Sequence, residues 1–81
     1  MIEKTQQKYI SKLHPDYRAV LSMYVKDKKN RYIEIISCVN YENETVQVYF
    51  DMGEVYKKLK TKDKETKKKI EELEKAYTSL Q

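Results

Sequence analysis

The chain has very few of the residues that usually mark turns, crosslinks and metal sites. Its 81 residues include one glycine, one proline, one cysteine, one histidine and no tryptophan. The lone Cys38 excludes an internal disulfide, and no Cys/His spacing fits zinc. One glycine excludes the glycine-rich phosphate loops of nucleotide-binding proteins. Because His14 and Cys38 are single and far apart in sequence, nothing supplies paired catalytic groups. The sequence therefore predicts a non-enzymatic protein without cofactor or metal.

Long hydrophobic runs are also absent. No apolar stretch approaches the ~18 to 20 residues of a membrane span, and Met1 to Thr5 contains no apolar signal core. With the single cysteine, this predicts a soluble cytoplasmic protein, or one in the host-cell cytoplasm if the source is a virus. Leu, Ile, Val and Phe make up 18 of the 81 residues, just above the roughly 20% level below which chains tend to be disordered. We expect one small domain, 1–81, with a thin core.

Lysine and tyrosine are what the chain does have. Seventeen Lys and Arg against 13 Asp and Glu give a net charge of +4, and there are eight tyrosines. Between Lys57 and Lys69, eight of thirteen residues are lysine and only Asp63 and Glu65 are acidic. A basic balance favours nucleic acid, acidic proteins or an anionic surface as partner.

Periodicity predicts a mixed α+β fold. Apolar residues at helical spacing predict a first helix that ends near Leu13, ahead of Pro15. Residues 31–41 and 45–50 are typical of strands, with polar turns at 26–30 and 42–44. Residues 17–25 fit either a strand or a helix, and a strand is favoured because a two-stranded hairpin alone is marginal. The predicted order is an N-terminal helix, a three-stranded antiparallel meander and a long C-terminal helix.

The C-terminal helix is expected to begin near Met52, with Asp51 as its capping residue. Val55, Tyr56 and Leu59 open its apolar stripe, and Ile70, Leu73, Tyr77 and Leu80 close it, but the middle positions of that register are polar. The segment 53–81 is therefore either one helix with a solvated centre or two helices with a break near Thr61. The spacings from Asp63 to Lys67 and from Glu65 to Lys69 favour one continuous helix.

On a continuous helix the lysines would form a one-sided ridge opposite the apolar stripe. Such a ridge would contact several backbone phosphates of a nucleic acid. The other interpretation is that these lysines only keep the outer face of an amphipathic helix soluble. Since lysine recognises geometry poorly and only Arg18 and Arg31 are present, base-specific recognition is not indicated.

Both faces of the predicted sheet carry apolar side chains. We expect the helices to cover the face formed by Ala19, Leu21, Met23, Ile33, Ile35, Val39, Val46, Val48 and Phe50. The opposite face would then hold Val20, Tyr24, Tyr32, Ile36, Cys38 and Tyr49. That face is too apolar to stay wet. The first helix, a second copy of the chain, or single-stranded bases stacked on the tyrosines would cover it.

The predicted order of helix, three strands and helix resembles the double-stranded-RNA-binding domain, whose last helix opens with phosphate-contacting lysines. In this chain Lys57, Lys58, Lys60 and Lys62 would take that place. The Gly-Pro and His loop that the family carries between its first two strands is absent here. The resemblance implies a nucleic-acid partner.

Two functional hypotheses follow. The first is sequence-nonspecific binding of DNA or RNA, through Lys57, Lys60, Lys64, Lys67, Lys68, Arg18, Arg31, Tyr24 and Tyr49. The second is a protein-interaction module, an inhibitor or regulator encoded by a virus or mobile element, which would self-associate as a homodimer. Its interface would be Tyr32, Ile36, Ile70, Leu73, Tyr77 and Leu80.

Overall fold

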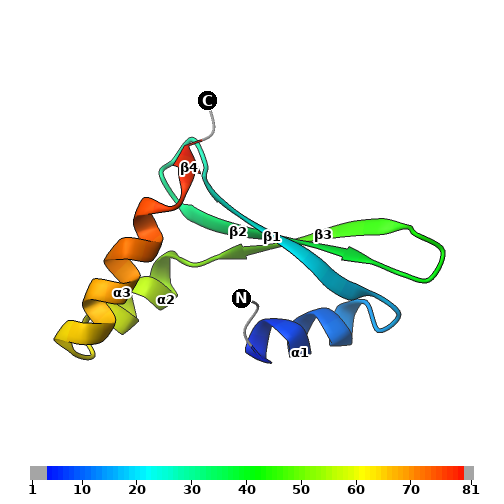
Figure 1. The fold of residues 1–81 in the computed structure, drawn as a ribbon, viewed down its shortest axis with the longest axis horizontal. Coiled ribbons are helices and arrows are strands. Elements are labelled where there is room, and N and C mark those ends of the chain that lie inside the picture. The colour runs from blue at the N-terminus through cyan, green and yellow to red at the C-terminus, as the bar shows by residue number, and fades with distance from the viewer. Residues whose placement is uncertain (1–3, 80–81) are drawn as a thin grey trace. The chain divides into compact units, whose positions relative to one another are not determined.

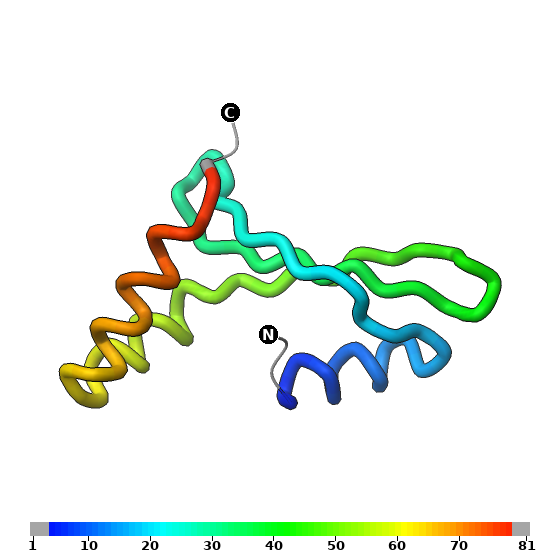
Figure 2. Tube along the Cα trace, viewed as in Figure 1, coloured from blue at the N-terminus to red at the C-terminus, as the bar shows by residue number. Residues whose placement is uncertain are grey.

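A computed structural model describes residues 4–79, and its elements follow the predicted order (Figures 1 and 2). They are α1 (Lys4–Leu13), β1 (Arg18–Lys26), β2 (Tyr32–Val39), β3 (Thr45–Asp51), α2 (Gly53–Lys60), α3 (Lys64–Lys75) and β4 (Thr78–Ser79). The α+β class and the three-stranded meander are confirmed, and the ambiguous segment is a strand. The long C-terminal helix is instead two helices, followed by a short strand. The sheet order is β3-β2-β1-β4, and β4 pairs parallel to β1 at Val25 and Lys26.

The chain divides into two compact units, and each of the three long strands contributes residues to both. Unit 1 comprises Met1–Met23 and Ile35–Tyr49, and unit 2 comprises Tyr24–Glu34 and Phe50–Gln81. Unit 1 therefore contains α1 and the loop between β2 and β3. Unit 2 contains the loop between β1 and β2, both C-terminal helices and β4.

The loop between β1 and β2, Asp27–Arg31, is a tight turn closed by one carboxylate; we call it the basic loop. Asn30 N–H donates to the Asp27 carbonyl at 3.0 Å, and Asp27 N–H donates to the Arg31 carbonyl at 3.2 Å. Asp27 Oδ1 also accepts from the backbone N–H groups of Lys29 and Arg31, each at 2.9 Å. Asn30 has a φ of 60°, a left-handed conformation that asparagine tolerates better than most residues. This is a type I turn followed by a left-handed residue, a common hairpin connection.

The loop between β2 and β3, Asn40–Glu44, has the same construction; we call it the acidic loop. Asn43 N–H donates to the Asn40 carbonyl, and Asn40 N–H donates to the Glu44 carbonyl, both at 3.2 Å. Asn40 Oδ1 accepts from Glu42 N–H at 3.0 Å and Glu44 N–H at 2.9 Å, and Asn43 has a φ of 62°. An Asx side chain and a left-handed asparagine therefore close both hairpins.

These loops fix the strand registers, and the register between β2 and β3 differs from the predicted one, so that Val46, Val48 and Phe50 share a face with Ile36 and not with Leu21. Pairing Asn40 with Glu44 places Ile36 and Val48 on one face and Tyr49 on the other. In unit 1, Ile36 and Cys38 are 0% exposed and Val48 is also buried, together with Ile10 of α1. Tyr49, Leu21 and Met23 are exposed instead, by 62%, 56% and 40%. The prediction that the helices cover the face of Leu21 and Met23 was wrong.

Unit 2 has an aromatic core. Met52, Tyr56, Ile70 and Tyr77 are buried together, and five partly buried side chains pack against them: Tyr24, Tyr32, Phe50, Leu59 and Leu73. The tyrosine rings meet edge to face, with centroids 5.0 Å apart for Tyr32 and Tyr77 and 5.3 Å for Tyr24 and Tyr77. The hydroxyl groups of Tyr56 and Tyr77 share a hydrogen bond. Tyrosine therefore supplies in this unit the buried area that a chain with one Phe and no Trp would otherwise lack.

A buried carboxylate lies beside this aromatic core. Glu34 on β2 is only 3% exposed. Burial, the hydrogen bond with Tyr56 and the nearby charge of Glu34 all raise the pKa of Tyr77. Burial and then Glu34 likewise raise the pKa of Tyr24. The core of unit 2 therefore keeps these phenols protonated.

Candidate nucleic-acid interface

The lysine-rich segment forms a helical hairpin, because its centre stops one helix and starts another. Thr61 Oγ1 donates to the Lys58 carbonyl at 2.7 Å at the end of α2. Asp63 is the N-cap of α3, and its Oδ1 accepts from Thr66 N–H at 2.7 Å. That hydrogen bond holds the pKa of Asp63 below its usual value. The break falls at residues 61–63, so a ridge along one continuous helix does not exist.

The start of α2 differs slightly from the predicted cap. Met52 occupies the N-cap position and makes no side-chain capping bond. Asp51 Oδ1 accepts instead from Gly53 N–H at 3.0 Å. A Cβ at Gly53 would lie 3.3 Å from this oxygen, so the absence of a side chain there helps Asp51 approach. Asp51 therefore satisfies a backbone donor at the helix start, from one position further out than a cap.

One of the predicted phosphate contacts is engaged within the hairpin. Lys60 Nζ lies 2.7 Å from Glu74 Oε2, and the two side chains are 32% and 12% exposed. The hydrogen bond that Lys60 donates to the Glu74 carboxylate raises the pKa of Lys60. This partly shielded pair joins α2 to α3, which also pack directly against each other. Lys60 therefore has a structural role that the sequence pattern did not indicate.

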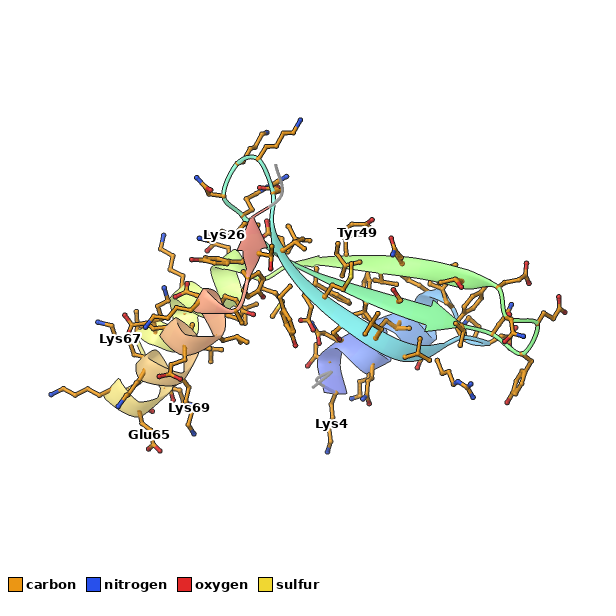
Figure 3. All side chains as sticks on the ribbon, turned by 45° about the horizontal axis from the view of Figure 1, so that its top comes forward. Lys4, Lys26, Tyr49, Glu65, Lys67 and Lys69 are labelled. Atoms are coloured by element: carbon orange, nitrogen blue, oxygen red, sulfur yellow. The ribbon has the colours of Figure 1, made fainter. Side chains whose placement is uncertain are left out.

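The other predicted lysines stay exposed on the two helices. Lys57 lies on α2, and Lys64, Lys67 and Lys68 lie on α3. None of these four forms an ion pair with any residue in the range 4–79. Lys69 Nζ lies 3.9 Å from Glu65 Oε1, and this exposed ion pair contributes little to stability. Figure 3 shows Lys67 extending outward from α3.

The basic loop adds cations that the sequence-based prediction missed. Lys28 and Lys29 are exposed at its tip, while Arg31 Nε contacts Asp27 Oδ2 at 2.6 Å. Lys26, at the end of β1, places its Nζ 5.2 Å from the ring centroid of Tyr32. The run Lys26-Asp27-Lys28-Lys29-Asn30-Arg31 was visible in the sequence as a basic turn. It was interpreted only as a connection between strands.

The structure brings three predicted residues around one hollow of unit 2. Arg31, Lys57 and Lys60 line a cavity of about 480 Å³. Its remaining lining comes from Asn30, Tyr32, Asp51, Gly53, Glu54 and Glu74. Because three acids share the lining with three bases, this hollow has no net charge to attract an anion. The exposed helix surfaces and the loop tip carry the unbalanced positive charge.

The remaining predicted residues lie elsewhere. Arg18 and Tyr49 belong to unit 1, and Tyr24 is half-buried against Tyr77. Among the predicted interface residues, Tyr32, Ile70, Leu73 and Tyr77 pack in the aromatic core of unit 2, and Ile36 is fully buried in unit 1. The monomer therefore uses these side chains for its own core. Leu80 lies outside the described residues.

Net charge is divided unequally between the units. Unit 2 contains 13 of the 17 Lys and Arg residues and 9 of the 13 acids, a net charge of +4. Unit 1 contains four basic and four acidic residues, so its formal net charge is zero. The whole formal charge of the protein therefore belongs to unit 2.

The single residues with reactive side chains are placed for packing. Cys38 is buried, its Sγ lies 3.9 Å from the Ile36 carbonyl oxygen, and burial raises the pKa of the thiol. The rings of His14 and Tyr17 pack in a T-shaped arrangement with their centroids 5.5 Å apart. Across residues 4–79 no group of three His, Cys, Asp or Glu side chains could hold a metal ion. No helix in the same range is long and apolar enough to cross a membrane.

Comparisons with protein-family models, with curated proteins and with solved structures find nothing that matches this chain. Within the described residues, the structure also lacks the long lysine-bearing last helix on which the resemblance to the double-stranded-RNA-binding domain depended. The lysine-bearing helix of that comparison is here the short α2, and Lys62 lies in the turn after it. The function is therefore argued from the charges and contacts of the chain itself.

Proposed function

We propose that unit 2 binds nucleic acid through the phosphate backbone without reading its sequence. The contacts are Lys57 on α2, Lys64, Lys67 and Lys68 on α3, and Lys28 and Lys29 of the basic loop. The observation that supports this most strongly is the division of charge, because unit 2 has a net charge of +4 while unit 1 has none. Lysine side chains without acidic partners are free to replace the counterions of a phosphate chain.

Three residues of the original prediction take lesser roles. Lys60 and Arg31 each have an acidic partner, Glu74 and Asp27, so binding phosphate would require them to exchange or share it. Tyr24 is half-buried and packs its ring against the core, so stacking that ring on a base would disrupt unit 2. The proposal therefore depends on phosphate contacts alone, and the same affinity is expected for different base sequences of equal length.

A salt titration tests the proposal. Anisotropy of a labelled oligonucleotide should give a log affinity that falls linearly with log salt, by ~0.7 to 0.9 for each phosphate neutralised. With four to six such contacts the slope should be roughly −3 to −5. Absence of binding to both DNA and RNA at low salt would refute the proposal.

A pair of triple variants separates a local site from overall charge. K64Q/K67Q/K68Q removes three exposed lysines from α3, and K4Q/K8Q/K12Q removes three exposed lysines from α1 in unit 1. Both variants lower the net charge equally. The α3 variant should reduce the salt slope by ~2 to 3, whereas the α1 variant should change it much less. Equal losses would show that binding follows net charge and has no site on unit 2.

A further inference from the structure

The first strand has an open edge in unit 1. On its outer side β1 pairs only with β4, at Val25 and Lys26. Along Arg18 to Met23, none of the described residues forms a strand on this outer side of β1, opposite to β2. The backbone N–H and C=O groups along this stretch are therefore available to another strand.

This edge lacks the features that usually prevent strands from pairing between molecules. Residues 19–23 are Ala-Val-Leu-Ser-Met and include no charge, proline or glycine. Val20, Leu21 and Met23 are all exposed large apolar residues. The other edge strand, β3, exposes one such residue, Tyr49, whose hydroxyl donates to Gln47 at 3.1 Å. The more apolar edge is therefore that of β1.

The register of a pairing follows from the basic loop. Asp27 N–H points to β2, since it donates to Arg31. Because successive residues of a strand alternate their hydrogen-bonding direction, Val20 and Ser22 direct their backbone groups to the open edge. An antiparallel copy of the same strand can bond Val20 of one chain to Ser22 of the other. The two-fold axis then passes beside Leu21, and Ala19 lies opposite Met23.

We propose that two copies of this chain associate by antiparallel pairing of residues 19–23 in this register. A second copy suits the edge because the stretch is self-complementary. No charged side chain faces its own counterpart, since the two Arg18 residues lie at opposite ends of the pairing. The axis brings together two Leu21 side chains, which in the monomer are more than half exposed. Pairing stops where β4 occupies the edge, so the association closes as a dimer.

The mass in solution, measured by sedimentation from low micromolar to submillimolar protein, tests the proposal. The parent chain should form a dimer. Leu21→Lys places two ammonium groups side by side at the axis and should raise the dissociation constant about tenfold or more. Tyr49→Lys, on the same open face but on β3, should leave it unchanged. A monomer throughout, an equal effect of both variants, or a mass that grows without limit would each overturn the proposal.

A crosslink tests the register without depending on the lysine variant. Residues opposite each other at a non-hydrogen-bonded antiparallel position have Cα atoms about 4.5 Å apart, within the range that a disulfide spans. Leu21→Cys should therefore form a crosslinked dimer under mild oxidation. Tyr49→Cys should not, and neither should the parent chain, whose Cys38 is buried. Failure of Leu21→Cys to crosslink, or equal crosslinking by Tyr49→Cys, would contradict the register.

Discussion

The basic loop and the acidic loop have the same backbone conformation and carry opposite net charge. In each, the first residue is an Asx whose side-chain oxygen accepts two backbone N–H groups, and the fourth is an asparagine at a φ near 60°. The residues between these positions differ completely, Lys28 and Lys29 in one loop and Tyr41 and Glu42 in the other. Turn geometry therefore depends on two positions, and the positions between them are free to vary in charge.

The two units to which these loops belong also differ in charge. The basic loop is part of the unit with an aromatic core and a net charge of +4. The acidic loop is part of the neutral unit, whose core is aliphatic and whose open sheet face exposes Leu21, Met23 and Tyr49. The two units therefore differ in surface chemistry, since one carries net positive charge and the other exposes apolar side chains.

The largest effect should come from truncating the aromatic core of unit 2. Tyr56→Ala removes a buried ring and the hydrogen bond to Tyr77, and should lower the free energy of unfolding by about 3 to 5 kcal/mol. A control is Tyr49→Ala, which removes an exposed ring from unit 1 and should cost less than ~0.5 kcal/mol. Urea unfolding followed by circular dichroism measures both, and similar losses would mean that unit 2 does not depend on its tyrosines.

The shared turn geometry predicts equal effects in the two loops. Asn30→Ala and Asn43→Ala each force alanine into the left-handed region and should each cost about 1 to 2 kcal/mol. Asn30→Gly and Asn43→Gly should cost less, because glycine adopts this conformation without a steric penalty. Urea midpoints of the four variants provide the test. A loss confined to one loop would show that the two turns differ in solution.

The stability of unit 2 should depend on alkaline pH, because two tyrosines of its core have raised pKa values. The pKa values of Tyr77 and Tyr24 are raised above 10.0, so the folded state holds these phenol protons more tightly than the unfolded state. Stability is therefore complete below about pH 10 and falls as the pH rises above it. Tyr77→Phe should cost about 1 kcal/mol at neutral pH and make this alkaline loss less steep. Urea unfolding on both sides of pH 10 measures the change, and an unchanged slope would contradict it.

The smallest effect distinguishes the first residues of the two loops. Hydrogen bonding from the Arg31 backbone holds the pKa of Asp27 below its ordinary value of 3.8, whereas Asn40 does not titrate. The contribution of Asp27 is present above that value and is lost as the pH falls through the lowered pKa. Asp27→Asn should therefore weaken the acid dependence of the urea midpoint, and Asn40→Asp should strengthen it. No change in either variant would show that the loops stay closed regardless of this charge.

Much of the fold was predictable from local patterns. Pro15 predicted the end of the first helix at Leu13, the Ile, Val and Tyr content of residues 31–41 predicted β2, and alternation predicted β3. The sheet faces were not predictable, because they depend on which residue of one strand lies opposite which residue of the next in each hairpin. Which residues face each other follows from the loops, whose three central residues are 28–30 and 41–43. The polar clusters in the sequence predicted turns at 26–30 and 42–44 instead. A shift of one residue exchanges the two faces of a strand.

The candidate site was predictable as a list of lysines but not as a surface. Asp63 was expected to pair with Lys67 along one helix, and it caps a second helix instead. A capping aspartate and a mid-helix aspartate look alike in sequence when no glycine or proline marks the boundary. The Lys60 and Glu74 pair depends on the packing of α2 against α3, which helical periodicity does not specify.

The pairing of β1 with β4 has a consequence for biosynthesis. Val25 is translated long before its partner Thr78, and Tyr77 immediately precedes that partner in the chain. Every segment of unit 1 has been translated once Tyr49 is added, whereas the core of unit 2 needs the chain as far as Tyr77. Unit 2 therefore completes its core later than unit 1, and until Tyr77 has been added Tyr24 and Tyr32 lack its ring as a packing partner.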